Sequence, residues 1–368
     1  MKKTFGYIIL SMAILLGLSA PEAFAGNKDR SGQAGASQLL INPWAASSGW
    51  GNAGMSKVHG LDAIFGNVAG ITSCNRLDLN FSHTDWLHGF DNKVRISSFG
   101  VLARVGESSV LGLSFMSFSI GEIPITTTEN PDPISSHGTA TLGTYKPNLM
   151  NINLAFAKSF SNSISGGFNL KIISESIKDM GGVGIALDAG IQYVTGPFDN
   201  VHFGITLKNI GPTMKYSGDG LSYKAWLVQT STQQFTVVQR ADEFELPTQL
   251  SIAAAYDWLF AENHRITIAG NFNSNSFTKD QFTLGLEYGW NDILMVRAGY
   301  TYENGIWAKG GVETNDDCMN VNRGLSAGLS VQAPLSKEEN GMKIALDYSF
   351  RDTYTFQGTH TIGARIIF

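Results

Sequence analysis

The stretch that most clearly decides the fold of this chain is residues 342–351, MKIALDYSFR. Large apolar side chains occupy alternate positions, and Lys343, Asp347 and Arg351 fall between them. Side chains on a β-strand point alternately to its two faces. The segment therefore predicts a strand with one apolar face and one polar face that carries charge.

The same alternation recurs along the chain, for example in residues 281–288 and, interrupted by Gly166, in residues 164–172. It predicts fourteen strands, an even number, as single-chain bacterial outer-membrane barrels have. The predicted strands cover residues 76–86, 93–105, 108–121, 149–160, 163–177, 183–195, 199–210, 246–259, 263–274, 280–291, 293–303, 322–333, 340–351 and 358–368.

Three further patterns favour a membrane barrel over a soluble β-sandwich. Charged residues inside the strands fall on the polar face, which a closed barrel encloses as a hydrated lumen. Tight turns such as 106–107 and 161–162 alternate with longer connections at 122–148, 211–245 and 304–321, as in outer-membrane barrels. Aromatic residues also stand at strand ends, as an interfacial girdle requires: Trp86, Tyr193, Trp258, Trp290, Tyr300 and Tyr302.

Composition points the same way. Charged residues make up 15% of the chain, whereas soluble domains average about 25%. The mean hydropathy of -0.02 is far too low for a helical membrane bundle, and no apolar run of about 18 residues follows residue 25. The formal net charge of -5 gives no reason to expect nucleic-acid binding.

The N-terminus reads as a secretory signal peptide covering residues 1–25. Lys2 and Lys3 precede a short apolar core at 8–18, and Ala23-Phe24-Ala25 forms a cleavage motif. Export combined with a membrane barrel predicts the cell outer membrane as the location, with its lipids as the surroundings.

The remaining chain divides into an N-terminal segment, residues 26–75, and a barrel, residues 76–368. Residues 26–75 do not alternate and are rich in Gly, Ala and Ser. They also hold apolar residues such as Leu39 and Trp44, in which disordered segments are poor. We therefore expect a plug in the lumen; the alternative is a disordered periplasmic tail. The fold class is thus an all-β transmembrane protein, a fourteen-stranded antiparallel outer-membrane β-barrel with an N-terminal plug.

The last predicted strand runs to the C-terminal Phe368. Its alternation places Ile362 toward lipid and Thr361 and Arg365 toward the lumen. A terminal aromatic residue on such a strand is similar to the signal read by the outer-membrane insertion machinery.

The sequence contains few candidate catalytic residues. Among seven histidines we find no known hydrolase or metalloprotease motif. His83 and Asp85 share a strand face near His88, and a barrel-embedded hydrolase could pair them with a serine; the alternative is a set of interfacial polar residues. We expect no enzyme activity, catalytic residue, metal or cofactor. Cys74 and Cys318 are expected to be free thiols.

The outer connection 211–245 is the candidate partner-binding loop. It gathers apolar and aromatic residues, and clusters of this kind commonly mark protein-binding sites. The alternative is a loop that folds over the barrel mouth and covers its own apolar surface. The candidate binding residues are Tyr223, Trp226, Leu227 and Phe235.

Several short motifs lie along the mature chain, beginning with residues 31–36, SGQAGA, and residues 66–71, GNVAGI. They resemble the PorV/PorQ family of the type IX secretion system, which is similar in fold to FadL-type fatty-acid transporters. Asn67, Ala69 and Gly70 match the family's Asn-Pro-Ala-Gly plug motif, in which this chain lacks the proline. Further matches lie at residues 52–54, 207–212, 246–248, 285–288 and 297–300.

This resemblance implies a role in protein export. A PorV-like protein accompanies the large translocon and receives the C-terminal domains of secreted cargo, whereas a PorQ-like protein anchors a surface attachment complex. The fold resemblance also leaves open a FadL-type channel for long-chain fatty acids or other hydrophobic small molecules. A membrane hydrolase is the third hypothesis.

Overall fold

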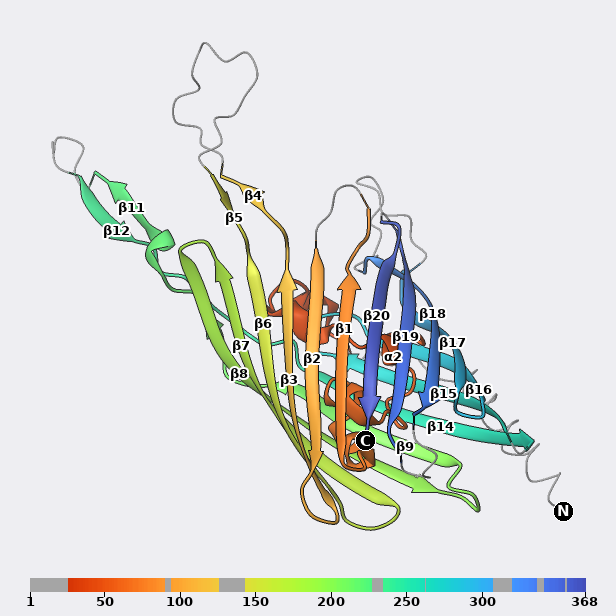
Figure 1. The fold of residues 1–368 in the computed structure, drawn as a ribbon. Coiled ribbons are helices and arrows are strands. Elements are labelled where there is room, and N and C mark those ends of the chain that lie inside the picture. Colours follow the sequence, from red (N-terminus) through yellow and green to blue (C-terminus); the bar gives the residue numbers. More distant parts are fainter. Residues whose placement is uncertain are drawn as a thin grey trace.

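The structure is a computed structural model that describes residues 26–89, 94–125, 143–226, 234–261, 263–306, 320–335, 341–354 and 356–368. These residues form a closed antiparallel barrel of fourteen strands with short helices inside it (Figure 1). The predicted barrel is therefore confirmed. The predicted signal peptide, residues 1–25, lies outside the described residues.

The barrel strands follow one another around the wall in chain order. Their bounds are β1 (Leu77–Asp85), β2 (Arg95–Arg104), β3 (Ser109–Ser119), β6 (Asn148–Ser159), β7 (Ile164–Ile177), β8 (Met180–Thr195), β9 (Val201–Ile210), β14 (Gln249–Ala261), β15 (His264–Asn275), β16 (Gln281–Trp290), β17 (Leu294–Glu303), β18 (Asn322–Pro334), β19 (Lys343–Thr353) and β20 (Thr359–Ile367).

The predicted boundaries differ most at β8, β14 and β19, where β19 begins at Lys343 rather than at residue 340. β8 begins at Met180 rather than at residue 183, because Ile177 pairs directly with Met180 across a two-residue turn. Gly181 and Gly182 carry no apolar alternation, so the pattern missed this turn. β14 begins at Gln249 rather than at residue 246, since Pro247 has no N–H to donate to a β-ladder.

The barrel closes where β1 pairs with β20, from Asp78 opposite Ile367 to Asp85 opposite His360. The two faces of β20 are oriented as predicted. Ile362 is 63% exposed on the outside, whereas Arg365 is 9% exposed within. Among the described residues, no helix is long and apolar enough to cross a membrane.

The connections at the two ends of the barrel differ in length, as in outer-membrane barrels, whose longer loops face outward. Three small two-stranded sheets and η5 (Asp219–Leu221) belong to the long connections. The β4–β5 and β11–β12 pairs project beyond the rim (Figure 1). The sheets are β4 (Ile123–Pro124) with β5 (Thr144–Tyr145), β10 (Met214–Lys215) with β13 (Glu243–Phe244), and β11 (Ser222–Ala225) with β12 (Phe235–Val238).

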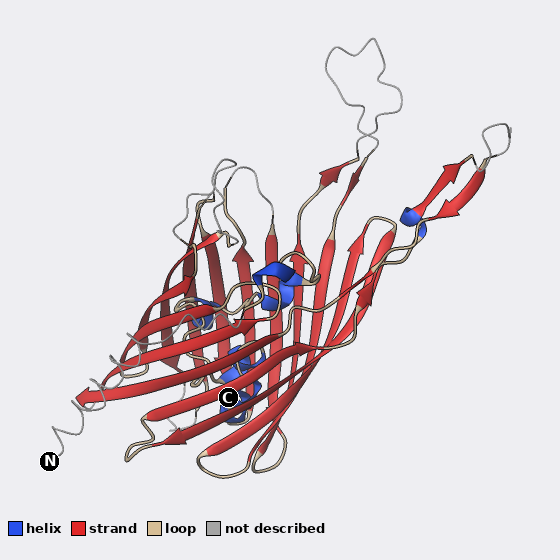
Figure 2. Ribbon diagram, turned by 180° about the vertical axis from the view of Figure 1, so that it is seen from behind, coloured by secondary structure: helices blue, strands red, loops and turns tan. Residues whose placement is uncertain are grey.

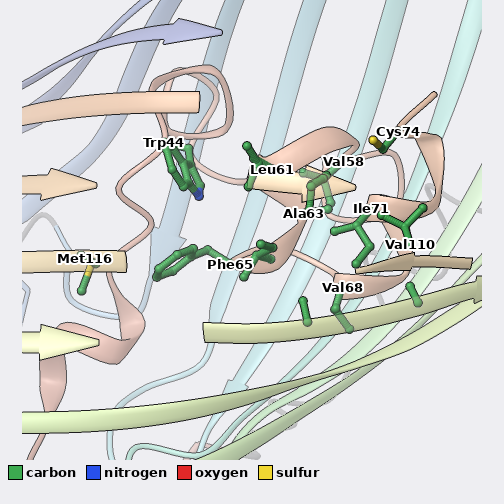
Figure 3. Close-up of a cluster of buried hydrophobic side chains, with 14 of the residues drawn as sticks. Trp44, Val58, Leu61, Ala63, Phe65, Val68, Ile71, Cys74, Val110 and Met116 are labelled. Carbon is green, nitrogen blue, oxygen red and sulfur yellow. The ribbon is translucent and has the colours of Figure 1, made fainter. Parts of the chain in front are cut away.

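Residues 26–75 run through the inside of the barrel (Figure 2). The largest apolar core lies between this segment and the wall: Trp44, Phe65 and Ile71 pack with inward side chains such as Leu102 of β2 and Met116 of β3 (Figure 3). The short helices are η1 (Lys28–Arg30), η2 (Ser37–Leu40), α2 (Ala45–Ser48), η3 (Gly60–Ile64) and η4 (Val68–Ser73).

Candidate functional site: the occupied lumen and the outer hairpins

Inward-facing glycines let the wall approach the backbone of the N-terminal segment. A Cβ atom added to Gly299 of β17 would stand 2.3 Å from the carbonyl oxygen of Trp50. A Cβ on Gly328 of β18 would stand 2.7 Å from Cα of Gly49. Real Cβ atoms do not come this close. The glycines therefore allow residues 49–54 to pack directly against the backbone of the wall.

The structure brings the three plug-motif residues together at the start of η4, with Asn67 as its N-cap and Ala69 and Gly70 within it. The Asn67 side chain accepts a hydrogen bond from the N–H of Ala69 at 3.2 Å and donates one to the carbonyl oxygen of Ile191 in β8 at 2.9 Å. A Cβ on Gly70 would stand 1.9 Å from the carbonyl oxygen of Val58. The motif therefore caps the helix, joins it to the wall and permits a close backbone crossing.

An ion pair joins the N-terminal segment to the barrel wall near its inner end. Lys57 Nζ lies 2.5 and 2.6 Å from the two carboxylate oxygens of Asp257 in β14. His202 Nε2 and Thr267 Oγ1 also contact that carboxylate, at 3.2 and 2.5 Å. Burial lowers the pKa of Lys57 from its ordinary value. The ion pair thus fixes residue 57 against the wall at the cost of removing an ammonium group from bulk water.

Further buried charges of the wall pair across neighbouring strands. Arg297 Nε donates to Glu287 at 2.6 Å, and Arg365 donates to Asp347 at 2.6 and 2.8 Å. Alternation predicted that these groups face the lumen. It did not indicate which acid meets which base, because that depends on the register of each strand pair.

The lumen holds a cavity toward each end. The outer cavity has a volume of about 630 Å³ and is lined by both polar residues, such as Gln249, and apolar ones, such as Trp86. The inner cavity has a volume of about 420 Å³ and is lined by charged residues including Asp78, Lys343 and Arg365. Residues of the N-terminal segment line both cavities.

The candidate partner-binding residues that the structure describes lie on the projecting β11–β12 hairpin or next to it. Tyr223, Trp226 and Phe235 are 54%, 55% and 45% exposed. Phe235 is the register partner of Ala225, so Tyr223 and Phe235 fall on the same face of the hairpin. Leu227 lies outside the described residues.

The candidate hydrolase residues do not form a relay. His83 Nδ1 lies 3.0 Å from Ser97 Oγ on β2, whereas the Asp85 carboxylate contacts His88 Nδ1 at 2.6 Å. The serine and the acid therefore meet different imidazoles, and a catalytic triad needs them on one. Across the described part of the chain, no three His, Cys, Asp or Glu side chains gather as a metal site.

Cys74 should resist alkylation in the folded barrel. Its side chain is buried, and burial raises its pKa to about 12. The thiolate is the reactive form, so at pH 8 we expect modification about a thousandfold slower than for an ordinary thiol of pKa about 8.5. Maleimide labelling of a Cys318→Ser variant, followed by mass spectrometry, measures this rate. Cys318 itself lies outside the described residues.

The matched control carries Cys74→Ser, Cys318→Ser and Ser73→Cys, because position 73 is exposed next to the buried one. This control should label rapidly. Equal labelling rates at positions 73 and 74 in the folded protein would contradict the prediction.

Solved structures similar to this chain have the same kind of fold at low identity. The Pseudomonas putida toluene transporter TodX is 13% identical with a TM-score of 0.52, covering 89% of this chain and 97% of that chain. The Ralstonia pickettii toluene transporter TbuX is 13% identical with a TM-score of 0.51 and the same two coverages, 89% and 97%. At such identities the likeness shows the fold alone. No curated protein sequence matches the chain.

Residues 67–344 match the family described as "Type IX secretion system membrane protein PorP/SprF". The secretion system implied by the sequence motifs is therefore confirmed, and so is the outer-membrane location of the barrel. The narrower PorV/PorQ resemblance is not what the match shows. This chain is an outer-membrane barrel that belongs to the type IX secretion system PorP/SprF family.

Proposed function

We propose that this barrel serves type IX secretion by binding exported cargo or surface-attachment components at its outer face. The observation that carries the proposal is the β11–β12 hairpin, which projects past the rim (Figure 1). Tyr223 and Phe235 of this hairpin and the adjoining Trp226 are exposed. A two-stranded hairpin is marginally stable alone, and exposed aromatic clusters commonly mark partner sites. Membership in the PorP/SprF family supports the secretion context.

The occupied lumen supports a binding role over a general pore. The N-terminal segment packs against both halves of the wall, through η4 on β6, β7 and β8 and through α2 on β18, β19 and β20. The proposed partners are the large translocon or attachment complex and the C-terminal domains of cargo. Binding of cargo would be a PorV-like role, and binding of the attachment complex a PorQ-like one. We propose no catalytic activity and no cofactor.

A FadL-type channel for hydrophobic small molecules is the second candidate. The observation that favours it is the apolar side of the outer cavity, formed by Trp86, Phe118, Ile120 and Leu149. The inner cavity, which such a molecule would have to enter next, is lined by Arg265, Lys343 and other charged groups.

The triple substitution Tyr223→Ser, Trp226→Ser and Phe235→Ser tests the binding role. Truncating an aromatic anchor costs about 2 kcal/mol or more, roughly a thirtyfold loss in affinity. We therefore expect affinity purification in mild detergent to recover little or none of the secretion components that the unmodified barrel recovers. Quantitative mass spectrometry of the eluates measures this loss. The identities of the recovered proteins distinguish cargo from attachment proteins.

The control is Ile123→Ser on the projecting β4–β5 pair, which changes one apolar residue on another outer hairpin. Its eluate should match that of the unmodified protein. Unchanged recovery with the triple variant would contradict the proposed binding surface. Loss of fatty-acid uptake on gene deletion, with the barrel purifying alone, would favour the channel instead.

A further inference from the structure

Three imidazoles lie on neighbouring positions of the outer surface of the barrel near its outer rim, since His360 is the register partner of Asp85, two residues from His83. His83 belongs to β1, His88 follows β1, and His360 belongs to β20. β1, β20 and β19 lie side by side in the wall (Figure 1). The rings of His88 and His360 are in edge contact, with centroids 5.6 Å apart. We call His83, His88 and His360 the rim imidazole cluster.

Each imidazole of the cluster is held through its Nδ1 atom. His83 Nδ1 lies 3.0 Å from Ser97 Oγ, His88 Nδ1 lies 2.6 Å from Asp85 Oδ2, and His360 Nδ1 lies 2.8 Å from the Tyr348 hydroxyl. Within the described residues no hydrogen bond or ion pair reaches any of the three Nε2 atoms. The wall therefore orients the rings through Nδ1, and in the described part of the chain Nε2 is left to bind a ligand from outside.

The cluster stands where the lipid-facing surface changes from apolar to polar. Phe81 of β1, Ile362 of β20 and Leu346 of β19 lie on the outward faces of these strands, on the side of the cluster nearer the inner end of the barrel. They are 51%, 63% and 60% exposed. On the same faces, two residues nearer the outer rim, stand His83, His360 and Tyr348. This change of polarity marks the outer membrane interface, where headgroups lie.

The charges around the cluster favour an anion. Arg95 is exposed on β2 and is the register partner of Asp85. Among the described residues of this rim, Asp85 pairs with His88 and Asp352 lies 3.9 Å from Arg323. Imidazole and guanidinium groups both donate hydrogen bonds to phosphate oxygens.

We propose that the rim imidazole cluster, with Arg95, binds the phosphorylated headgroup of an outer-leaflet lipid. The phosphate accepts hydrogen bonds from the Nε2–H groups of His83 and His360, whose Nδ1 atoms accept from the Ser97 and Tyr348 hydroxyls, and from the Arg95 guanidinium group. His88 donates through Nδ1 to Asp85, and its ring packs against that of His360. The acyl chains of the lipid then lie along the apolar strip that begins at Phe81 and Ile362. This site faces the membrane and is separate from the β11–β12 hairpin, so it does not rest on the proposed binding of secretion components.

The test compares lipid binding by the full-length barrel and a triple variant, His83→Gln, His88→Gln and His360→Gln. Native mass spectrometry in neutral detergent measures binding of diphosphorylated lipid A and of the same lipid without phosphates. We expect the triple variant to bind the phosphorylated lipid about tenfold more weakly, because charge-assisted hydrogen bonds are lost. The dephosphorylated lipid should bind weakly to both proteins.

The matched control is His264→Gln, since His264 also contacts a tyrosine hydroxyl, that of Tyr288 at 2.8 Å, but lies at the inner end of the barrel. This variant should bind like the unmodified protein, and heat-modifiable gel mobility should show that all variants are folded. Equal affinity of the triple variant and the unmodified barrel would overturn the proposal. So would displacement of the lipid by EDTA, which would indicate a cation bridge on Asp85, or by millimolar inorganic phosphate, which would remove any role for the lipid chains.

Discussion

The Gly299→Val variant should conduct ions through a barrel that is otherwise obstructed. Even the first side-chain atom at this position would stand 2.3 Å from the Trp50 carbonyl oxygen and 2.8 Å from Ser326 Oγ. β17 is held on both sides, by β16 and β18, so the wall cannot yield easily. The N-terminal segment must move instead. Overpacking of this kind costs about 1–3 kcal/mol. This cost lowers the ratio of barrels with the N-terminal segment in place to barrels with the segment displaced by roughly 5- to 150-fold.

Planar-bilayer recording measures this effect as an increase in the frequency and size of open-channel events. The control is Gly270→Val on β15, where a Cβ would meet Leu284 Cδ2 at 3.6 Å and the Thr283 carbonyl oxygen at 4.0 Å, both ordinary contact distances. That variant should record like the unmodified barrel. A folded Gly299→Val protein with unchanged conductance would show that residues 49–54 do not obstruct the lumen, and the proposed plug would have to be abandoned.

Asp347→Ala should destabilise the barrel by about 3–5 kcal/mol, because it leaves a buried guanidinium group without its acid. The Arg365 side chain donates two hydrogen bonds to Asp347, and Ser330 Oγ donates a third. Both charged residues are shielded from water, at 4% and 9% exposure. Urea unfolding in lipid vesicles, followed by tryptophan fluorescence, measures the loss in the free energy of unfolding.

Two controls separate the buried charge from the substitution itself. Glu122→Ala removes an exposed pair, Glu122 with Lys146 at 2.8 Å, and should cost at most about 1 kcal/mol. The double variant Asp347→Leu, Arg365→Met removes both buried charges and should recover most of the lost stability. If the double variant is as unstable as Asp347→Ala, packing and not the unpaired charge causes the effect.

The sequence predicts which residues form much of the candidate site, but not how they are arranged in space. The apolar residues of the 211–245 connection indicated an outer binding surface, and the structure places Tyr223, Trp226 and Phe235 on or next to one projecting hairpin. The rim imidazole cluster was not predicted as a unit. His83 and His88 are near neighbours in the sequence, whereas His360 joins them only because β20 closes the barrel against β1.

The sequence by itself determined the number of strands, the face on which each side chain lies and the terminal position of β20. These are local properties, because alternation with a period of two is set by backbone geometry within each strand. Only the tertiary structure decided which groups meet. Lys57 and Asp257 are 200 positions apart, and Arg365 reaches Asp347 through the register of β19 with β20. Register, closure and the path of residues 26–75 depend on contacts between distant segments, and no local pattern encodes them.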